Sequence, residues 1–506
     1  MTMTFWLPLI VLFSSLVTGL VIFMLPEERS RLRTTLNMLG ASVKVAGVFL
    51  MAWGLLAHDV VYEVRFTMGF GFDFLLKVDL LSLAFVSLSS NLWFLTTLYA
   101  VGYLEGSPNR SRFFGFFSLC VTASTGVALA GNLITFFIFY EFLTLVTYPL
   151  VVHRGTPKAL EAGRTYLWHA VTAGAVLFLA VVWLQVLSGP FDFVPGGALH
   201  AVENLSGTDL KVIFALLIIG LGVKSALVPL HGWLPTAMIA PAPVTALLHA
   251  VAVVKAGAFG VMRVIFDVYG KDFAADLGLL SPLAVVVVVT ILFGSVRALM
   301  QRELKRRLAY STVSQISYIV LGAVVLGPLA TVGGLVHLVH QGIMKITLFF
   351  CAGILSEFLG IYRIDQMDGV GRKMPVTMAL FSIAALGMIG VPPVAGFVSK
   401  WHLAQGGIQG GQEWVVAVLV VSSLLNAAYF LPILHACWFK PAAMDFEGTN
   451  TQRGTFSKWW EAPWTLMLPT LATALFSLAA GVFAGWEWSP LGVAEKIARG
   501  RDGGLP

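Results

Sequence analysis

The sequence has little charge and very little cysteine. Only 11% of its 506 residues are Asp, Glu, Lys or Arg, whereas about a quarter of a soluble domain is charged. Its three cysteines, Cys120, Cys351 and Cys437, sit singly in apolar segments, so a disulfide framework and a cysteine metal site have no support. It also lacks CxxC, P-loop and dinucleotide-binding glycine patterns. These absences argue against a soluble enzyme, a disulfide-rich secreted domain and a nucleic-acid-binding protein.

Apolar residues are abundant, and they occur in long runs. They make up 58% of the chain, and the mean hydropathy is +0.86. Since a transmembrane helix uses about 20 residues, this content allows up to about 14 spans. The expected centres lie near residues 15, 46, 91, 121, 142, 175, 219, 254, 287, 315, 343, 384, 425 and 475. The first run has no basic segment before it and no small-residue cleavage site after it, so we expect it to be a span and not a signal peptide.

The positive charges between these runs alternate strongly from loop to loop. Numbering each loop by the span before it, nineteen Arg and Lys residues fall in odd loops and about five in even loops. Basic residues concentrate on the cytoplasmic side of membrane proteins. We therefore expect a multi-pass protein of the cell inner membrane, with the odd-numbered loops in the cytoplasm and both termini on the opposite side.

Several ionisable residues lie inside the apolar runs, where a charge costs about 2.5–3.5 kcal/mol on insertion scales. We expect Lys44, which is close to a basic loop, to extend its ammonium to the membrane interface. The other intramembrane lysines and the one unambiguous intramembrane carboxylate are candidates for function: Lys224, Lys255, Lys345, Lys400 and Glu141. Five histidines also fall inside spans: His169, His249, His337, His340 and His435.

Two of these lysines lie close to prolines that interrupt a span. Lys224 precedes Pro229 by five residues, and Lys400 follows Pro393 by seven. Proline frees backbone groups, which membrane proteins tolerate where they line a polar path. The segments VPLHGW (228–233) and PPVAGF (392–397) resemble each other and lie five spans apart. This spacing predicts two inverted five-helix repeats, spans 4–8 and 9–13, with broken helices 7 and 12; two unrelated proline kinks are the alternative.

The buried ionisable residues suggest a lateral route for protons. Glu141 needs a positive partner, and Lys224, two spans later, is our candidate. Lysine and histidine can both exchange protons when buried, so Lys255, His249, His337, His340 and Lys345 are expected to continue the path to Lys400. For each histidine, simple helix packing is the alternative, and we favour it for His169 and His435.

Five segments of the chain resemble one known family. They are KSALVPLHGWLPTA (224–237), APAPVTALLHAVAVVKAGAFGVMR (240–263), ELKRRLAYSTVSQISYI (303–319), HQGIMKITLFFCAGIL (340–355) and GVPPVAGFVSKW (390–401). In this order they resemble the proton-translocating antiporter-like membrane subunits. That family includes chains of respiratory complex I, of Mrp-type cation/proton antiporters and of membrane-bound hydrogenases. The resemblance covers roughly residues 75–440.

The resemblance implies an all-α polytopic fold of 14 transmembrane helices, with inverted repeats and broken helices 7 and 12. It assigns Glu141 to the family's essential glutamate of helix 5 and Lys224 to the lysine of helix 7. It likewise assigns Lys255 to helix 8, Lys400 to the charged residue of helix 12, and His340 with Lys345 to the His/Lys pair of helix 11. We divide the chain into helices 1–3 (1–110), a first repeat (111–270), a second repeat (271–440), and a loop, last helix and tail (441–506).

The expected function is proton translocation within a multi-subunit complex, without a cofactor or metal in this chain. The chain ends soon after the last span, which favours the D-type subunit of an Mrp-type Na⁺/H⁺ antiporter. An ion-pumping subunit of a complex I-like oxidoreductase or a hydrogenase is the alternative, as is a subunit of an inorganic-carbon uptake complex. The expected partners are other membrane subunits, including homologous antiporter-like chains, together with lipid, protons and Na⁺, but no nucleic acid.

Two other classes of membrane protein remain as alternatives. Intramembrane histidines can ligate haem in a redox enzyme, but the sequence has no haem-attachment or dinucleotide pattern. An independent carrier of an organic solute fits the inverted repeats, but a row of lysines across several helices fits a charge relay better than one central pocket.

Overall fold

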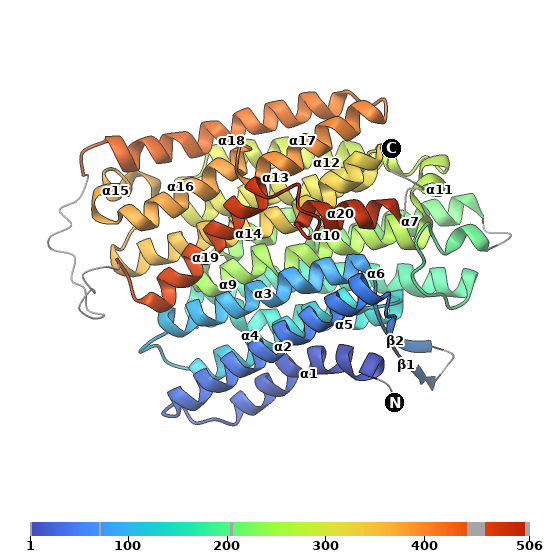
Figure 1. The fold of residues 1–506 in the computed structure, drawn as a ribbon, viewed down its shortest axis with the longest axis horizontal. Helices are drawn as coiled ribbons and strands as arrows, with labels where there is room; N and C mark the ends of the chain where they lie inside the picture. The colour runs from blue at the N-terminus through green and yellow to red at the C-terminus, as the bar shows by residue number, and fades with distance from the viewer. Residues whose placement is uncertain (1–2, 70–71, 203–205, 443–460, 501–506) are drawn as a thin grey trace.

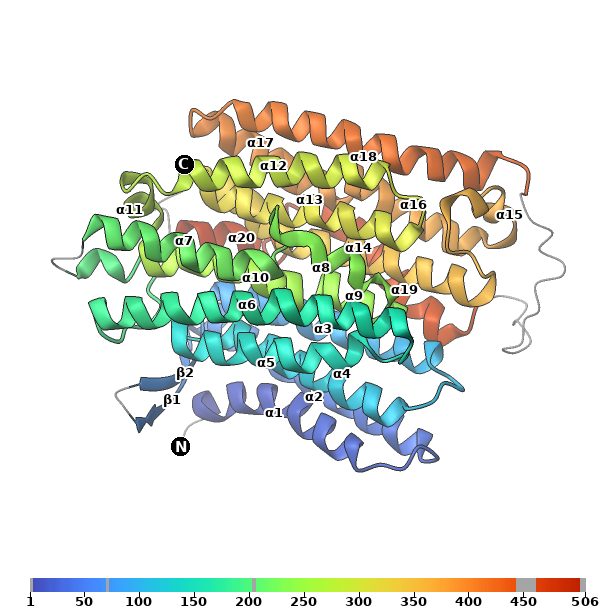
Figure 2. The same ribbon diagram turned by 180° about the vertical axis from the view of Figure 1, so that it is seen from behind.

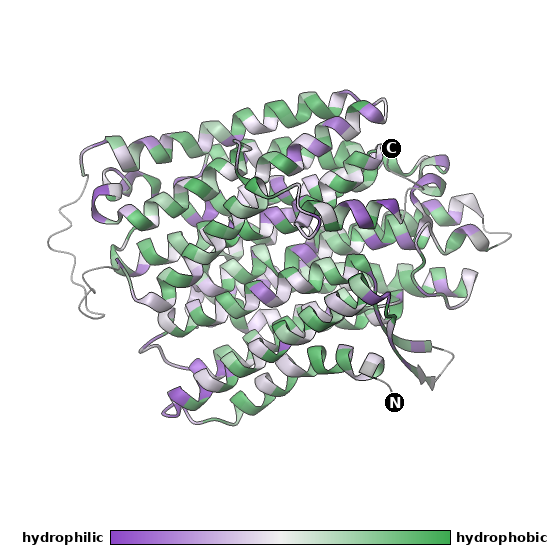
Figure 3. Ribbon diagram, in the orientation of Figure 1, coloured by the Kyte–Doolittle hydropathy of each residue, from purple (hydrophilic) through white to green (hydrophobic). Residues whose placement is uncertain are grey.

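Long helices lie side by side through almost the whole molecule (Figures 1 and 2). This computed structural model describes residues 3–69, 72–202, 206–442 and 461–500. Most of the loop expected before the last span, and the end of the tail, fall outside these residues. The helices are green over most of their length, and purple residues gather towards their ends (Figure 3). This pattern is typical of a bundle that crosses a membrane.

The N-terminal half contains the first eight expected spans. Its long helices are α1 (Met3–Phe23), α2 (Ser30–His58), α3 (Leu80–Tyr103), α4 (Arg110–Leu129), α5 (Leu133–Val151), α6 (Pro157–Ser188) and α7 (Gly207–Lys224). Shorter elements follow: η2 (Leu199–Ala201) before α7, then η3 (Leu230–Gly232), α8 (Trp233–Thr236), η4 (Ala237–Ile239), α9 (Ala242–Ala250), α10 (Val253–Arg263) and the π-helical η5 (Val264–Tyr269).

The C-terminal half contains the remaining helices. They are α11 (Lys271–Asp276), α12 (Leu280–Leu299), α13 (Leu304–Val324), α14 (Pro328–Phe358), η6 (Ile364–Gln366), α15 (Val370–Lys373), α16 (Pro375–Ile389), α17 (Ala395–Gln409), α18 (Trp414–Phe439), α19 (Trp464–Val482) and α20 (Pro490–Arg499). The long α14 is central: helices from both halves of the chain pack against it, among them α9, α13 and α17.

The predicted helical membrane fold is confirmed. Within the described residues, eleven helices are long and apolar enough to cross a membrane. Each of the fourteen expected centres lies in a helix. Of the other three spans, the one at α7 has three charged residues among its 18, the one at α13 is less apolar because it contains several serines, tyrosines and a glutamine, and the one at α16 and α17 is divided into two short helices. The total of fourteen spans and the inverted repeats stay predictions.

Both expected interruptions are present. One lies between the end of α7 at Lys224 and the start of α8 at Trp233, and the other separates α16 from α17 at residues 390–394. A third interruption, which we did not expect, separates α9 from α10 at Val251 and Ala252. No proline or charge marks this place in the sequence, so periodicity alone could not reveal it.

The loop after α2 contains a β-hairpin, which the expected all-helical fold does not include. Strands β1 (Tyr62–Met68) and β2 (Phe72–Val78) pair antiparallel, with Tyr62 opposite Val78. Tyr62, Val64, Leu76 and Val78 are buried, since alternate residues of a strand point to the same face. Aromatic and β-branched residues favour strands, and the loop is too short to have shown a clear pattern.

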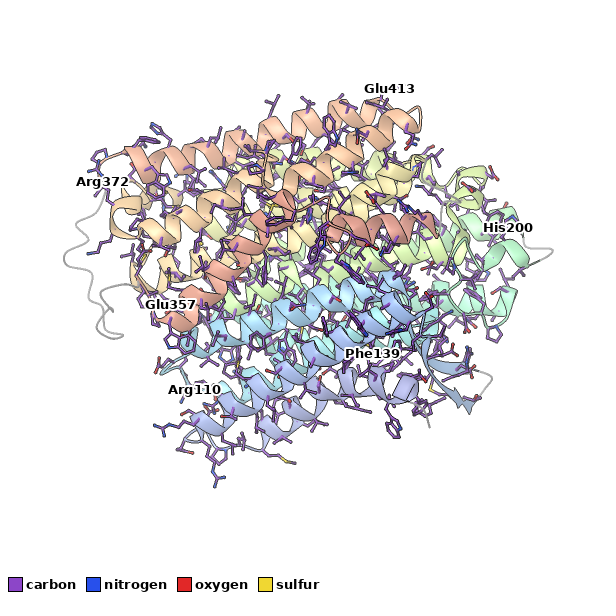
Figure 4. The ribbon with its side chains drawn as sticks, viewed as in Figure 1. Arg110, Phe139, His200, Glu357, Arg372 and Glu413 are labelled. Carbon is purple, nitrogen blue, oxygen red and sulfur yellow. The ribbon has the colours of Figure 1, made fainter. Side chains whose placement is uncertain are left out.

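The loops alternate between the two ends of the bundle. Arg110, Glu357 and Arg372, from odd-numbered loops, lie towards one end, whereas His200 and Glu413, from even-numbered loops, lie towards the other (Figure 4). α1 begins, and α20 ends, towards the even-loop end (Figure 1). The arrangement has the alternation that the charge distribution predicts; which end faces the cytoplasm stays a prediction.

Candidate functional site

Glu141 and Lys224 form an ion pair between α5 and α7. Lys224 Nζ lies 4.0 Å from Glu141 Oε1. The lysine side chain is only 1% exposed, but the glutamate side chain is 26% exposed. Lys224 Nζ also donates a hydrogen bond to the backbone carbonyl of Tyr140 and lies over the Tyr140 ring, 3.3 Å from its centroid. Of the pair, therefore, the glutamate side chain is the member that reaches the molecular surface.

A glycine on α6 leaves room for this carboxylate. A Cβ atom at Gly174 would lie 2.6 Å from the carboxylate oxygens of Glu141. Real Cβ atoms essentially never approach so closely. Gly174 therefore fixes how near α6 approaches the ion pair, a role that the sequence pattern did not indicate.

The interruption after α7 places Lys224 at the carboxyl end of a helix. The chain then turns through Ala226, whose φ is 55°. The indole nitrogen of Trp233 donates to the carbonyl of Val223 (2.7 Å), and the hydroxyl of Thr290 accepts from the amide of Val228 (3.0 Å). These bonds satisfy backbone groups that the interruption frees. A cation near the negative end of the helix dipole is electrostatically favoured.

Lys400 lies on α17, after the second interruption, and reaches back across it to a different set of partners. Its ammonium donates to the carbonyls of Met388 (3.0 Å) and Ile389 (2.8 Å), at the end of α16, and to Ser423 Oγ (3.0 Å). Among the described residues, no ion pair is formed by Lys400. Backbone dipoles and a hydroxyl stabilise this ammonium, whereas a carboxylate stabilises Lys224.

Lys255 and His337 lie where α10, α14 and α17 meet. Lys255 Nζ donates to the carbonyl of Leu338 on α14 (2.6 Å). His337 Nδ1 lies 2.8 Å from Ser399 Oγ on α17, and its ring packs against Tyr318 at 5.1 Å between centroids. Because Ser399 precedes Lys400, these contacts link the middle of the bundle to the second interruption.

Lys345 connects to Lys400 through residues that the sequence did not single out. Lys345 Nζ donates to Ser311 Oγ (2.7 Å), and Ser311 Oγ lies 2.8 Å from the Tyr429 hydroxyl. Tyr429 donates to Asn426 Oδ1, whose amide nitrogen lies 3.4 Å from the Met388 carbonyl that also accepts from Lys400. Ser311 lies within the segment at residues 303–319 that carries part of the family resemblance, but nothing in that segment distinguished Ser311 from its neighbours.

The two remaining histidines of the predicted path are buried in the core. His249 packs against Phe349 with 4.6 Å between ring centroids. Neither ring nitrogen of His249 has a hydrogen-bond partner within the described part of the chain, whereas the ring of His340 interacts with the backbone of Ala395 on α17. Buried polar atoms are usually paired, so the ring of His249 is open to a transient partner.

The other two intramembrane histidines lie on α6 and α18. His169 Nδ1 contacts the carbonyl of Thr165 on its own helix (2.8 Å), and His435 is exposed. Lys44, in contrast, corrects our expectation. It is fully buried and donates to Thr125 Oγ1 at 2.8 Å, so it does not extend to the interface. α2 is 29 residues long and Lys44 lies at its middle, too far from either end for the side chain to reach.

Two models of known protein families match this chain, and both describe membrane chains related to complex I. The family model described as "NADH:quinone oxidoreductase/Mrp antiporter, TM" matches residues 130–426. The chain belongs to this family. The model for the N-terminus of complex I chain 5 matches residues 66–114. Both breaks beside Lys224 and Lys400 lie within the part that the antiporter family model covers.

The relatives of this chain include subunits of oxidoreductases and subunits of antiporters. The N-type NADH-quinone oxidoreductase subunit of Desulforudis audaxviator is 35% identical over 395 residues, or 76% of this chain and 77% of the relative. The D-type Na(+)/H(+) antiporter subunit of Bacillus subtilis is 25% identical over 453 residues, or 88% of each. The chain is therefore a polytopic, antiporter-like membrane subunit, and its relatives are subunits of larger complexes.

The fold of this family member matches solved structures over nearly its full length. A chain of the Mrp complex from Dietzia sp. DQ12-45-1b has a TM-score of 0.85 at 24% identity, covering 99% of this chain and 98% of that chain. A chain of an archaeal membrane-bound sulfane sulfur reductase has a TM-score of 0.82 at 22% identity, covering 97% of each chain. These likenesses show a shared fold.

Proposed function

We propose that this chain translocates protons as one subunit of a multi-subunit membrane complex, and that it is the D-type subunit of an Mrp-type Na⁺/H⁺ antiporter. The observation that carries the proposal is the Glu141–Lys224 pair at an interrupted helix, followed by three further buried lysines. Uncompensated intramembrane charges are costly and mark ion or proton pathways. The proposed path comprises Glu141, Lys224, Lys255, His249, His337, His340, Lys345 and Lys400.

The proposed mechanism begins at the partly exposed carboxylate of Glu141. A charge outside this chain can act on that carboxylate and weaken its attraction for Lys224. A buried ion pair that opens leaves a costly, uncompensated charge, so Lys224 then favours passing its proton onwards. Lys255 and His337 carry the proton through the middle of the bundle. The Ser311–Tyr429–Asn426 contacts connect Lys345 with Lys400, where backbone carbonyls hold the ammonium.

The likeness to the D-type Na(+)/H(+) antiporter chain of Bacillus subtilis supports the antiporter assignment, because it extends over 88% of both chains. The second candidate is an ion-pumping subunit of a redox-driven complex. The 35% identity with the N-type NADH-quinone oxidoreductase chain favours that candidate. In both cases the partners are other membrane subunits, including homologous antiporter-like chains.

Everted membrane vesicles that contain the native complex distinguish the two functions. A respiratory pH gradient is first established and followed with a pH-sensitive dye, and NaCl is then added. An Mrp-type antiporter dissipates the gradient on NaCl addition, and Glu141→Gln abolishes that response. The matched control is Lys373→Met, which removes an exposed lysine at the end of α15. If the vesicles instead move protons when a quinone reductant is added but do not respond to NaCl, the antiporter assignment is replaced by the redox-driven one.

A different result would contradict the broader proposal that the buried path carries protons. If Glu141→Gln and Lys224→Ala both assemble normally and leave every proton movement of the vesicles unchanged, the buried path does not carry protons. Immunoblots of the chain and its co-purified subunits establish assembly. The subunits that co-purify also identify the complex: iron–sulfur or nickel subunits indicate a redox-driven pump.

We also propose that the odd-numbered loops face the cytoplasm of the inner membrane. The three native cysteines are buried, so single introduced cysteines can be labelled selectively. Arg372→Cys lies in an odd loop and Glu413→Cys lies in an even loop. With a membrane-impermeant thiol reagent, intact cells should label only the second, and everted vesicles only the first. The reverse result would invert the topology.

A further inference from the structure

A row of buried polar contacts joins α2 to α4 outside the path described above. Arg33 Nη1 donates to Ser111 Oγ (2.9 Å), Ser118 Oγ donates to Asn37 Oδ1 (3.3 Å), and Lys44 Nζ donates to Thr125 Oγ1 (2.8 Å). Between the last two, Thr122 Oγ1 donates to Ser15 Oγ on α1 (2.8 Å). We call these four contacts the α2–α4 ladder.

Every side chain of the ladder is buried, Lys44 completely so. Successive members on α2 are four and seven residues apart, and those on α4 are three to seven apart. These spacings put each set on one face of its helix. Apolar side chains would pack two membrane helices together equally well, so stability alone does not call for an ammonium at this depth.

Lys44 resembles Lys400 more than Lys224 in its surroundings. Its ammonium bonds to a hydroxyl and lies 5.6 Å from the centroid of the Trp93 ring. Within the described residues, no ion pair is formed by Lys44. An ammonium without a carboxylate partner in the membrane carries a large desolvation cost, and releasing a proton removes that cost.

The outer end of the ladder opens at the odd-loop end of the bundle. The carboxylate of Glu27 accepts hydrogen bonds from the amides of Arg110 (3.0 Å) and Ser111 (2.9 Å), and it lies 3.9 Å from Arg33. The side chain of Glu27 is 43% exposed. A proton from solvent therefore has an ionisable group at the entrance.

The inner end of the ladder reaches the unexpected interruption in the eighth span. Ser124, adjacent to Thr125, places Oγ 3.5 Å from the carbonyl of Val251 and 3.5 Å from Ser89 Oγ. Val251 lies at the break between α9 and α10. Lys255 follows four residues later, in the first turn of α10.

We propose that the α2–α4 ladder is a second proton-conducting branch, which leads from the odd-loop end through Lys44 to Lys255. Lys44 receives one proton from the Glu27 side and releases one, through its contact with Thr125, towards the break at Val251, so that it returns to its starting state. The proposal rests on the proposed function. The α2 side of the ladder lies outside the regions that the two family models match. Those regions are residues 66–114 and 130–426, whereas the α2 members are Lys44, Asn37 and Arg33.

The test measures proton movement in vesicles that contain the intact complex. Lys44→Met and the near-isosteric Thr125→Val should each lower the initial rate about tenfold or more, as loss of a proton-transferring group does. Ser42→Ala, at an exposed position of the same helix, is the control and should leave the rate unchanged. Glu141→Gln serves as the reference for loss of the main path.

Substitutions of Lys44 by other basic residues separate proton transfer from a structural role. Arginine keeps the charge but cannot release its proton in a protein, so Lys44→Arg should be as slow as Lys44→Met. Histidine can exchange a proton near neutral pH, so Lys44→His should keep more activity than either. A purely structural lysine predicts the opposite order, with arginine the best replacement.

The outcomes distinguish this proposal from the one on which it rests. Normal rates for Lys44→Met or Thr125→Val, with Glu141→Gln inactive, would overturn the ladder and leave the main path intact. If Glu141→Gln is also fully active, the proposed function itself fails. If Lys44→Met does not assemble, Thr125→Val decides, because it retains the lysine.

Discussion

Lys224 is buried inside the bundle, whereas the side chain of Glu141, 4.0 Å away, is partly exposed. This asymmetry means that an external charge reaches the pair through the glutamate alone. It also determines which substitution harms the structure more.

The first prediction concerns the stability of this pair. Removing one member of a buried pair costs up to about 3–5 kcal/mol, because the other charge loses its partner. Glu141→Gln leaves the fully buried ammonium uncompensated, so it should lower the thermal aggregation temperature of the complex more than Lys224→Met does. The double variant Glu141→Gln/Lys224→Met should recover most of the loss without recovering transport. A double variant that is less stable than either single variant would contradict the pairing.

The second prediction concerns the end of α16. Lys400→Met removes the donor to two backbone carbonyls and a serine hydroxyl, and an unsatisfied buried polar group costs about 1–3 kcal/mol. We expect lower thermal stability together with slow proton transport. Lys373→Met, at an exposed position, should change neither property. Transport at the control rate in Lys400→Met would remove Lys400 from the path.

The third prediction tests the connection between Lys345 and Lys400. Tyr429→Phe removes the hydroxyl that contacts both Ser311 and Asn426 but keeps the ring and its packing. Proton transport should fall several-fold while assembly stays normal. Tyr362→Phe is the matched control, because Tyr362 is exposed in a loop. Equal rates for the two variants would show that this connection carries no protons.

The fourth prediction uses the glycine beside Glu141. Gly174→Ala places a methyl group 2.6 Å from the carboxylate, so the carboxylate must move and its contact with Lys224 must change. Transport should therefore fall, although alanine favours helix more than glycine does. A Cβ at Gly485 meets nothing within 4 Å, so Gly485→Ala is the control. A fully active Gly174→Ala would show that the position of the carboxylate is not critical.

The fifth prediction concerns acid and the β-hairpin. Arg65 bonds to Asp73 on the hairpin (2.7 Å) and to Asp192 in the loop before α7 (2.5 Å). The hydrogen bond from Arg65 lowers the pKa of Asp73. The stabilisation is therefore present above the ordinary carboxyl pKa of about 4 and is lost as the pH falls through the lower, folded value. Protection of the β1 and β2 amides against hydrogen exchange, relative to the intrinsic rate at each pH, should fall in that range, and Arg65→Met should show low protection at every pH.

Much of the fold followed from the distribution of apolar and charged residues. Runs of about 20 apolar residues form helices in a membrane because the backbone has no other hydrogen-bond partner there. Pro229 and Pro393 predicted two interruptions, because proline has no backbone N–H to donate within a helix. The break at Val251 carries no such signal, and the alternating residues of β1 lie outside the long apolar runs on which the expected fold rests.

The candidate site divides in the same way. Burial cost alone identified Glu141, Lys224, Lys255, Lys345 and Lys400 as unusual. It could not identify Ser311, Asn426 or Tyr429, since hydroxyl and amide side chains are common in transmembrane helices. It also misplaced Lys44, because nearness to a basic loop in sequence said nothing about which face of α2 the lysine occupies.

The scarcity of charge was therefore the most informative feature of this sequence. Composition and the order of charges determined that the chain is a helical membrane protein, and the cost of a buried charge singled out Glu141 and four lysines and suggested that Glu141 pairs with Lys224. Only the tertiary structure showed that Lys44 is also buried, and only it decided the other partners: helix-end carbonyls for Lys400 and a threonine hydroxyl for Lys44. Those partners depend on contacts between helices far apart in the chain, which no local pattern encodes.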